Sequence, residues 1–284
     1  MPTPGPEALS EHWDPGFGSR RATYRRPEAA PRFKMIAGHI RAAAVLVLLG
    51  GAAAAQDSVD PALMEQGAAL YAQNCLLCHR PEGQGTTDVF PPLAGSENLA
   101  NAEYIVTNIH QGVVTMPPFP WLSDAEVAAL ASYVRNSFGN TYGGITEAEV
   151  TAIRATLDPA LPVLSIWDGI YTQEQADKGR AVFNSPCGLC HGSRLNGAPD
   201  DQDMRPAPPL ARANFLRVWD GRSLGMLYSY SRMTMPQSNP GFLPDEDYLA
   251  IIAHMLATTG VPPGDTPLSM EIKDLGRIRI GPAP

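Results

Sequence analysis

A five-residue motif of two cysteines followed by histidine occurs twice in this chain and constrains its fold more than any other feature. The first copy, Cys75–His79, reads CLLCH, and the second copy, Cys187–His191, reads CGLCH. The chain contains four cysteines in total, and the two motifs use all of them. The chain is therefore expected to form two similar sites, one in each half.

The spacing of the motif explains its chemistry. The pattern C-x-x-C-H is the attachment signal for covalent haem c. Two thiols separated by two residues can each form a thioether to one vinyl group of a porphyrin, and the adjacent histidine then supplies one axial nitrogen to the iron. The predicted attachment residues are Cys75, Cys78, Cys187 and Cys190, and the predicted proximal ligands are His79 and His191.

Two other uses of four cysteines remain open. Structural zinc favours four-coordinate sulfur sites, but zinc ribbons place their cysteine pairs about 15–20 residues apart, whereas 112 residues separate Cys75 from Cys187. Two disulfides are compatible with an exported protein. Neither alternative explains the histidine that follows each pair, so we favour two covalent haems.

The first 55 residues have the composition of a segment that precedes the folded protein. Residues 1–34 are rich in Pro, Arg and small residues and are predicted to be disordered or to reflect a mis-assigned start. Residues 35–55 have the charge, apolar core and small-residue exit of a secretory signal peptide. The weakly polar run 42–55 spans about 21 Å as a helix, against roughly 30 Å of hydrocarbon. We expect export to the periplasm. The alternative is that this segment stays uncleaved as a membrane anchor, so the sequence is compatible with membrane association but does not require it.

Acidic side chains predominate after this segment. Residues 1–55 contain seven of the 21 Lys and Arg and four of the 29 Asp and Glu, so residues 56–284 carry a formal charge of −11. Binding of nucleic acid requires a basic face, so this class of partner is not expected. The charge favours a protein partner with a basic docking patch, unless it serves only solubility.

The duplication extends beyond the cysteines. Gly67 and Tyr71 lie eight and four residues before the first motif, and Gly179 and Phe183 lie at the same distances before the second. Residues four apart share one face of a helix, and a glycine there would let another helix approach closely. A Pro-Pro pair, a Met-Pro pair and a final helix signal then follow in the same order in both halves. The halves are predicted to share a fold.

The predicted fold class is all-α, because no run of alternating β-branched and polar residues reaches strand length. Pro and Gly, with 28 and 26 residues, favour short helices joined by stiff loops. Acidic residues open helical patterns at 127–134 and 248–256, and a third helix is expected within 146–156. We predict a first domain at 56–142, a linker at 143–165, a second domain at 166–261 and a tail at 262–284 that packs on the surface or stays loose.

With these features the chain resembles a dihaem c-type cytochrome built from two class I cytochrome c domains, over nearly all of residues 56–284. The resemblance implies that a methionine before proline fills the sixth iron position, and Met116 and Met235 match. Such Met/His ligation raises the reduction potential. It also implies that a proline carbonyl accepts the Nδ1 proton of each proximal histidine; Pro91 and Pro208 match that position.

Other residues compete with these candidates. Met233 lies two residues before the second candidate methionine. His110 is a rival at the first haem and His254 at the second, although a lone histidine is more often solvated or hydrogen-bonded. His254 also occupies the final-helix position matched by Tyr133, which favours a packing role. Met226 is interpreted as ordinary core.

The segment Trp167–Ala176 resembles the opening of haem domains that accompany periplasmic quinoprotein dehydrogenases. The resemblance implies an electron carrier of a respiratory chain, without catalysis of its own. It would pass single electrons from a periplasmic dehydrogenase to a terminal oxidase or soluble cytochrome, alone or as the cytochrome subunit of a dehydrogenase complex.

The competing class is a dihaem redox enzyme. A peroxidase-like enzyme needs an iron that can open a site, yet both halves offer Met-Pro. A thiosulfate dehydrogenase-like enzyme uses a cysteine as one sixth ligand, and the chain has no fifth cysteine. A membrane-bound subunit would need a stable anchor, and the apolar stretch before Gln56 has the pattern of a cleavable signal. We therefore favour the carrier.

Overall fold

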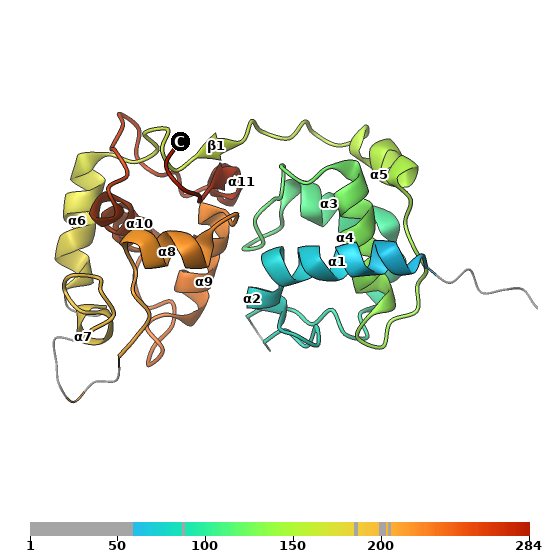
Figure 1. Cartoon of the computed structure of the whole chain (residues 1–284), viewed down its shortest axis with the longest axis horizontal. Coiled ribbons are helices and arrows are strands. Elements are labelled where there is room, and N and C mark those ends of the chain that lie inside the picture. The colour runs from blue at the N-terminus through green and yellow to red at the C-terminus, as the bar shows by residue number, and fades with distance from the viewer. Residues whose placement is uncertain (1–58, 87–88, 185–186, 199–202, 204–205) are drawn as a thin grey trace, which may run out of the picture. The chain divides into compact units, whose positions relative to one another are not determined.

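The computed structural model describes residues 59–86, 89–184, 187–198, 203 and 206–284 (Figure 1). The predicted disordered segment 1–34 and the predicted signal peptide 35–55 lie outside these residues. The first half contains α1 (Pro61–Asn74), α2 (Leu76–His79), the 3-10 helix η1 (Glu97–Ala100), α3 (Ala102–Gln111), α4 (Asp124–Asn136) and α5 (Glu147–Arg154). The second half contains β1 (Leu164–Ser165), α6 (Gln173–Phe183), α7 (Gly188–His191), α8 (Arg212–Trp219), α9 (Leu224–Thr234), α10 (Asp245–Thr259), α11 (Ile272–Gly276) and β2 (Ile278–Arg279).

The all-α prediction is confirmed. The two named strands in the described part of the chain have two residues each and pair in parallel, with Leu164 opposite Ile278. Every helix in the described ranges is too short or too polar to cross a membrane.

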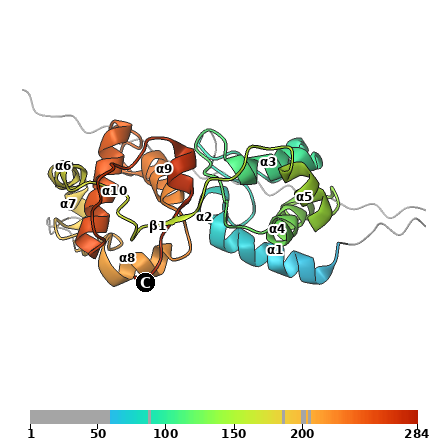
Figure 2. The same cartoon turned by 90° about the horizontal axis from the view of Figure 1, so that it is seen from above.

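An equivalent pair of helices forms the centre of each half. In the first half α1 packs against α4, and in the second α6 packs against α10 (Figures 1 and 2). A Cβ atom added to Gly67 would lie 2.2 Å from the carbonyl oxygen of Ala129, and one added to Gly179 would lie 1.8 Å from that of Ala250. The close approach predicted at both glycines is confirmed, because no larger residue leaves room for the opposing backbone.

Equivalent ring contacts accompany these glycines. The ring centroids of Tyr71 and Tyr133 lie 5.6 Å apart, and those of Phe183 and His254 lie 5.8 Å apart. Aromatic pairs at such separations add about 0.5–1.5 kcal/mol to their area burial. His254 therefore packs in its half as Tyr133 does in the other, which confirms the packing interpretation.

The predicted helix signals correspond to helices, two of which begin with a capping box. Ser123 and Glu126 form a capping box at the start of α4, as do Thr146 and Glu149 at the start of α5. In each box the hydroxyl accepts from the backbone of the fourth residue, while the glutamate accepts from the backbone of the first. Three acidic residues occupy the first turn of α10, where the helix dipole favours them.

Helix α5, within the expected linker, packs on the first half. Val150 is fully buried against α3 and α4. The side chains of Thr151 and Arg154 donate hydrogen bonds of 2.5 and 2.6 Å to the carboxylate of Asp124 at the start of α4. These contacts attach the helix to the domain that precedes it.

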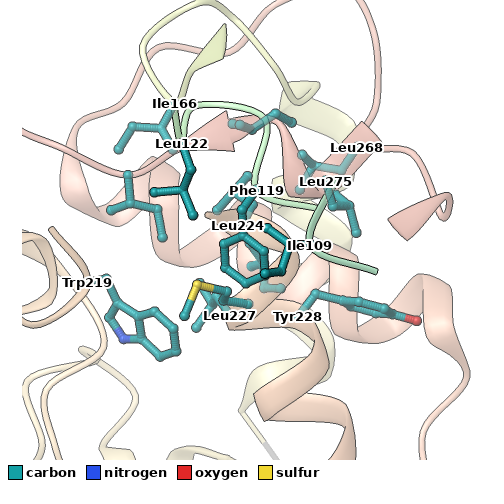
Figure 3. Close-up of a cluster of buried hydrophobic side chains, with 14 of the residues drawn as sticks. Ile109, Phe119, Leu122, Ile166, Trp219, Leu224, Leu227, Tyr228, Leu268 and Leu275 are labelled. Carbon is teal, nitrogen blue, oxygen red and sulfur yellow. The ribbon is translucent and has the colours of Figure 1, made fainter. Parts of the chain in front are cut away.

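The C-terminal segment differs from the expectation of a surface or loose tail. Leu268, Leu275, Ile278 and Ile280 are buried. Figure 3 shows Leu268 and Leu275 in a cluster with Ile109 and other residues of both halves. The segment is anchored because its apolar residues find partners that lie far away in sequence.

Candidate functional site

Each C-x-x-C-H motif forms a single helical turn; the first directly follows α1, and the second begins four residues after the end of α6. The backbone N–H groups of Cys78 and His79 donate to the carbonyl of Cys75 at 3.2 and 2.9 Å. The second motif has the same bonds, from Cys190 and His191 to Cys187, at 3.2 and 2.9 Å. Residues three and four apart share one side of such a turn. The turn therefore presents both thiols and the imidazole together.

The state of the cysteines bears on the zinc and disulfide alternatives. All four thiols are free. Burial raises the pKa of Cys75 to about 12 and the pKa values of Cys78 and Cys187 to about 11. Burial thus favours the protonated form of these three thiols. Within the described ranges, no three His, Cys, Asp or Glu side chains converge to hold a metal, so the two pairs do not build a four-sulfur site.

The histidine of each motif lies beside the carbonyl group of a proline. Nδ1 of His79 lies 3.1 Å from the carbonyl oxygen of Pro91, and Nδ1 of His191 lies 2.9 Å from that of Pro208. A proton on Nδ1 satisfies this bond and leaves Nε2 free as a metal ligand. Burial lowers the pKa of both imidazoles, and the proline contacts oppose it only in part. Both rings are thereby favoured in the neutral form, which can bind a metal.

A cavity of about 420 Å³ lies next to the first motif. Cys75, Cys78, His79, Pro91 and Met116 all contribute to its wall. Most of the remaining wall is apolar, including Leu99, Ile105, Ile109, Leu130 and Val134. Cofactor pockets commonly have about 300–1,000 Å³ and a few polar groups on apolar walls. The residues present fit a haem: thiols for attachment, a nitrogen and a sulfur for the iron, and an apolar enclosure.

Met116 follows a tight backbone turn. Val113 and Met116 exchange two backbone hydrogen bonds, of 2.9 and 2.8 Å. The turn brings Met116 to the same cavity as His79, 37 residues earlier in the sequence.

His110 is directed elsewhere. Its Nε2 lies 2.9 Å from the carbonyl oxygen of Asp158. The ring lines a separate cavity of about 50 Å³, together with Lys273 and Arg277. The structure does not bring this rival ligand to the first candidate site.

The two methionines of the second half have different surroundings. Met233 lies in the last turn of α9, and its Sδ is 3.6 Å from Nη1 of Arg232. Met235 is the residue that ends the helix, and its carbonyl accepts a 2.7 Å hydrogen bond from the hydroxyl of Tyr248. The sulfur of Met233 thus already has a polar partner, while the backbone of Met235 is held by α10.

Sequence reasoning did not place two residues of the second half at the first site. Met226 and Ser229, on α9 of the second half, both line the first cavity. Met226 is buried, as expected of a core residue, but its surroundings include the candidate site. The 3.6-residue periodicity of α9 could mark these residues as inward-facing. It could not show which half they face.

The family model for cytochrome c oxidase, cbb3-type, subunit III matches residues 62–134 and 174–255, together more than half of the chain. Each matched segment contains one C-x-x-C-H motif.

Individual relatives match parts of the chain. The cytochrome c subunit of the quinone alcohol dehydrogenase of Gluconacetobacter polyoxogenes is 35% identical over 109 residues, 33% of this chain and 23% of the relative. The fructose dehydrogenase cytochrome subunit of Gluconobacter japonicus is 31% identical over 106 residues, 31% of this chain and 22% of the relative. A cytochrome c-552 of Thermus thermophilus is 33% identical over 131 residues, 38% of this chain and 82% of the relative. The chain spans about a quarter of the two dehydrogenase subunits.

Proposed function

Because the chain belongs to the c-type cytochrome family described as cytochrome c oxidase, cbb3-type, subunit III, we propose that it is a periplasmic dihaem electron carrier. When bound, haem c supplies reversible one-electron oxidation and reduction of its iron. The protein contributes attachment, axial ligands and an apolar enclosure. The proposed attachment residues are Cys75, Cys78, Cys187 and Cys190, and the proposed axial ligands are His79, Met116, His191 and Met235.

The observation that carries this proposal is the shared cavity of His79 and Met116. His79 would offer a nitrogen and Met116 a thioether sulfur to the iron of a bound haem. Ligation by both residues would leave no open position for a substrate and would favour the reduced state. Both properties suit transfer of electrons rather than catalysis at the metal.

The proposed partners follow from the relatives. Two of them are named as the cytochrome subunits of an alcohol dehydrogenase and a fructose dehydrogenase. The family model is named for a subunit of a cytochrome c oxidase. We therefore propose a periplasmic dehydrogenase as electron donor and an oxidase or another cytochrome as acceptor. The acidic character of residues 56–284 suits partners with basic docking faces.

The number of haems and their ligation test the proposal. Protein from a host competent in cytochrome maturation should retain two porphyrins per chain after denaturation and acid extraction. The ferric protein should show the methionine-to-iron charge-transfer band and should bind cyanide, peroxide and carbon monoxide only slowly at both irons. Rapid binding of these ligands at one iron in the unmodified protein would instead indicate an enzyme.

A substitution of the first sixth ligand sharpens this test. Met116→Ala should open the first iron, accelerate cyanide binding there, lower the potential of that haem and diminish the charge-transfer band. Met270→Ala is the matched control, because Met270 is exposed and is not among the residues that line the first cavity. If Met116→Ala behaves as the control does, Met116 is not the ligand.

A further inference from the structure

Helix α9 of the second half contacts the candidate site of the first half along one face. A Cβ atom added to Gly225 would lie 2.8 Å from Cβ of Pro117. The hydroxyl of Ser229 donates a hydrogen bond of 2.6 Å to the carbonyl oxygen of Thr115. Gly225 and Ser229 are four residues apart and so share a face of the helix, and Met226, beside them, lines the first cavity.

The contacted segment, Thr115–Pro118, is the one that carries Met116. Its two prolines have a fixed φ and no backbone N–H, and Met116, as the residue before a proline, is itself restricted to extended conformations. The segment is therefore stiff and moves as a unit. Whatever holds its ends determines where Met116 lies.

Residues of the second half hold both ends of this segment. Ser229 binds the carbonyl of Thr115 at the start. At the other end, a Cβ atom added to Gly276 of α11 would lie 2.4 Å from Cδ of Pro118. Pro118 is buried, and Ser229 is only 1% exposed. Water is therefore poorly placed to replace the Ser229 bond, and a hydrogen bond shielded from water is costly to lose.

We propose that Ser229 is a positioning residue for Met116, so that the second half of the chain sets the axial ligation of the first haem. This inference rests on the proposed function, because it takes Met116 as the sixth ligand. Met235, the candidate ligand of the second haem, ends the same helix α9. Met235 follows Ser229 by six positions, a distance of about 9 Å along a helix axis. One rigid element thus positions the candidate sulfur ligands of both haems.

The experiment uses the full-length, haem-loaded protein and the variant Ser229→Ala. Loss of the hydroxyl frees the Thr115 end of the segment, so Met116 should leave the iron more often. Cyanide binding at the first haem should become about five- to tenfold faster, as expected for one buried hydrogen bond, and the charge-transfer band should weaken. Ser229→Thr keeps a hydroxyl and should accelerate cyanide binding less than Ser229→Ala does.

Two controls distinguish the positioning of Met116 by Ser229 from a general weakening of the contact between the two halves. Nε of Arg222 donates a 3.2 Å hydrogen bond to the carbonyl of Gln73, a second link between the halves that does not involve the Met116 segment. Arg222→Lys should leave the cyanide rate at the first haem unchanged. In a Met116→Ala background, where that iron is already open, Ser229→Ala should add no further acceleration.

The outcomes distinguish this inference from the proposed function. If Met116→Ala opens the first haem but Ser229→Ala leaves the cyanide rate and the charge-transfer band unaltered, the role of Ser229 is wrong and the electron-carrier proposal stands. Equal acceleration by Arg222→Lys, or further acceleration in the Met116→Ala background, also overturns it. If Met116→Ala changes nothing, the ligand assignment itself fails.

Discussion

At the scale of single residues, the surroundings of a sulfur atom separate the two candidate ligands of the second half. The thioether of Met233 lies within reach of the guanidinium of Arg232, which also donates to Asp245 at 2.5 Å. To reach an iron, this sulfur would have to leave a cation that an ion pair holds in place. Met235 lies outside the helix, and the Tyr248 hydroxyl fixes its backbone. We therefore propose Met235 as the ligand.

This assignment predicts different results for two neighbouring substitutions. Met235→Ala should abolish the charge-transfer band of the second haem, lower its potential and allow cyanide to bind there rapidly. Met233→Ala, the matched control, should leave the band and the potential close to those of the parent protein. Visible spectroscopy and a redox titration measure both. The reverse pattern would assign the ligand to Met233.

At the scale of elements, each half depends on two helices that cross at a glycine. The crossing of α6 and α10 is the tighter one, since a Cβ atom added to Gly179 would lie 1.8 Å from the carbonyl oxygen of Ala250. That oxygen belongs to backbone inside a helix and cannot rotate away as a side chain would. Any larger residue must push the helices apart.

Gly179→Ala is accordingly expected to destabilise the protein by about 3 kcal/mol, the upper end of the cost of overpacking. Gly144→Ala is the control. Its added Cβ would meet Ser132 and Val59 at an ordinary 3.5 Å, so stability should change by about 0.5 kcal/mol or less. Chemical denaturation followed by circular dichroism measures both variants. A Gly179 variant as stable as the control would show that the helices can separate at little cost.

Helix α5 is held to α4 by a charged contact, which makes its contribution depend on pH. Hydrogen bonds from Thr151, and then Arg154, hold the pKa of Asp124 below its ordinary value of 3.8. Because the folded-state pKa lies below the unfolded one, the contribution to stability is complete above pH 3.8 and is lost as the pH falls through the lowered value.

Asp124→Asn should therefore reduce stability by about 1 kcal/mol at neutral pH, as for a partly buried pair with good geometry. The difference from the parent should shrink as the pH falls below 3.8. Glu147→Gln, at an exposed position in the first turn of α5, is the control and should change stability little at either pH. Denaturation curves at both pH values measure the effect, and a difference that persists at low pH would contradict it.

At the scale of the whole molecule, the two halves share one buried apolar cluster, to which the C-terminal segment contributes (Figure 3). Ile278 and Ile280 are buried, and the guanidinium of Arg279 between them lies 4.2 Å from the ring centroid of Trp121 in the first half. The last strand therefore closes the second half and also contacts the first.

Deletion of residues 278–284 should thus lower stability by about 4 kcal/mol or more, since it removes two buried isoleucines and the stacked arginine. Deletion of residues 282–284, which are exposed, is the matched control and should leave the melting temperature nearly unchanged. Thermal unfolding monitored by circular dichroism compares the two. Equal melting temperatures would mean that the segment is not part of the core.

Local spacing alone determined the parts of this protein that lie within a few residues of one another. The turns at Cys75 and Cys187, the helix contacts at Gly67 and Gly179, and the start of α4 at Ser123 all depend on intervals of three, four or eight residues. Helical geometry converts such intervals directly into a shared face or a cap. The all-α fold and the duplicated halves were therefore predictable.

Only the tertiary structure decided which distant residues meet at the first candidate site. The hydroxyl of Ser229 and the carbonyl of Thr115 are 114 positions apart, and no periodicity within α9 records that separation. For the same reason the sequence could not show that His110 turns to Asp158 or that Ile280 is buried. Contacts of this kind follow from how helices pack, and packing depends on the shapes of both surfaces rather than on the pattern of either one.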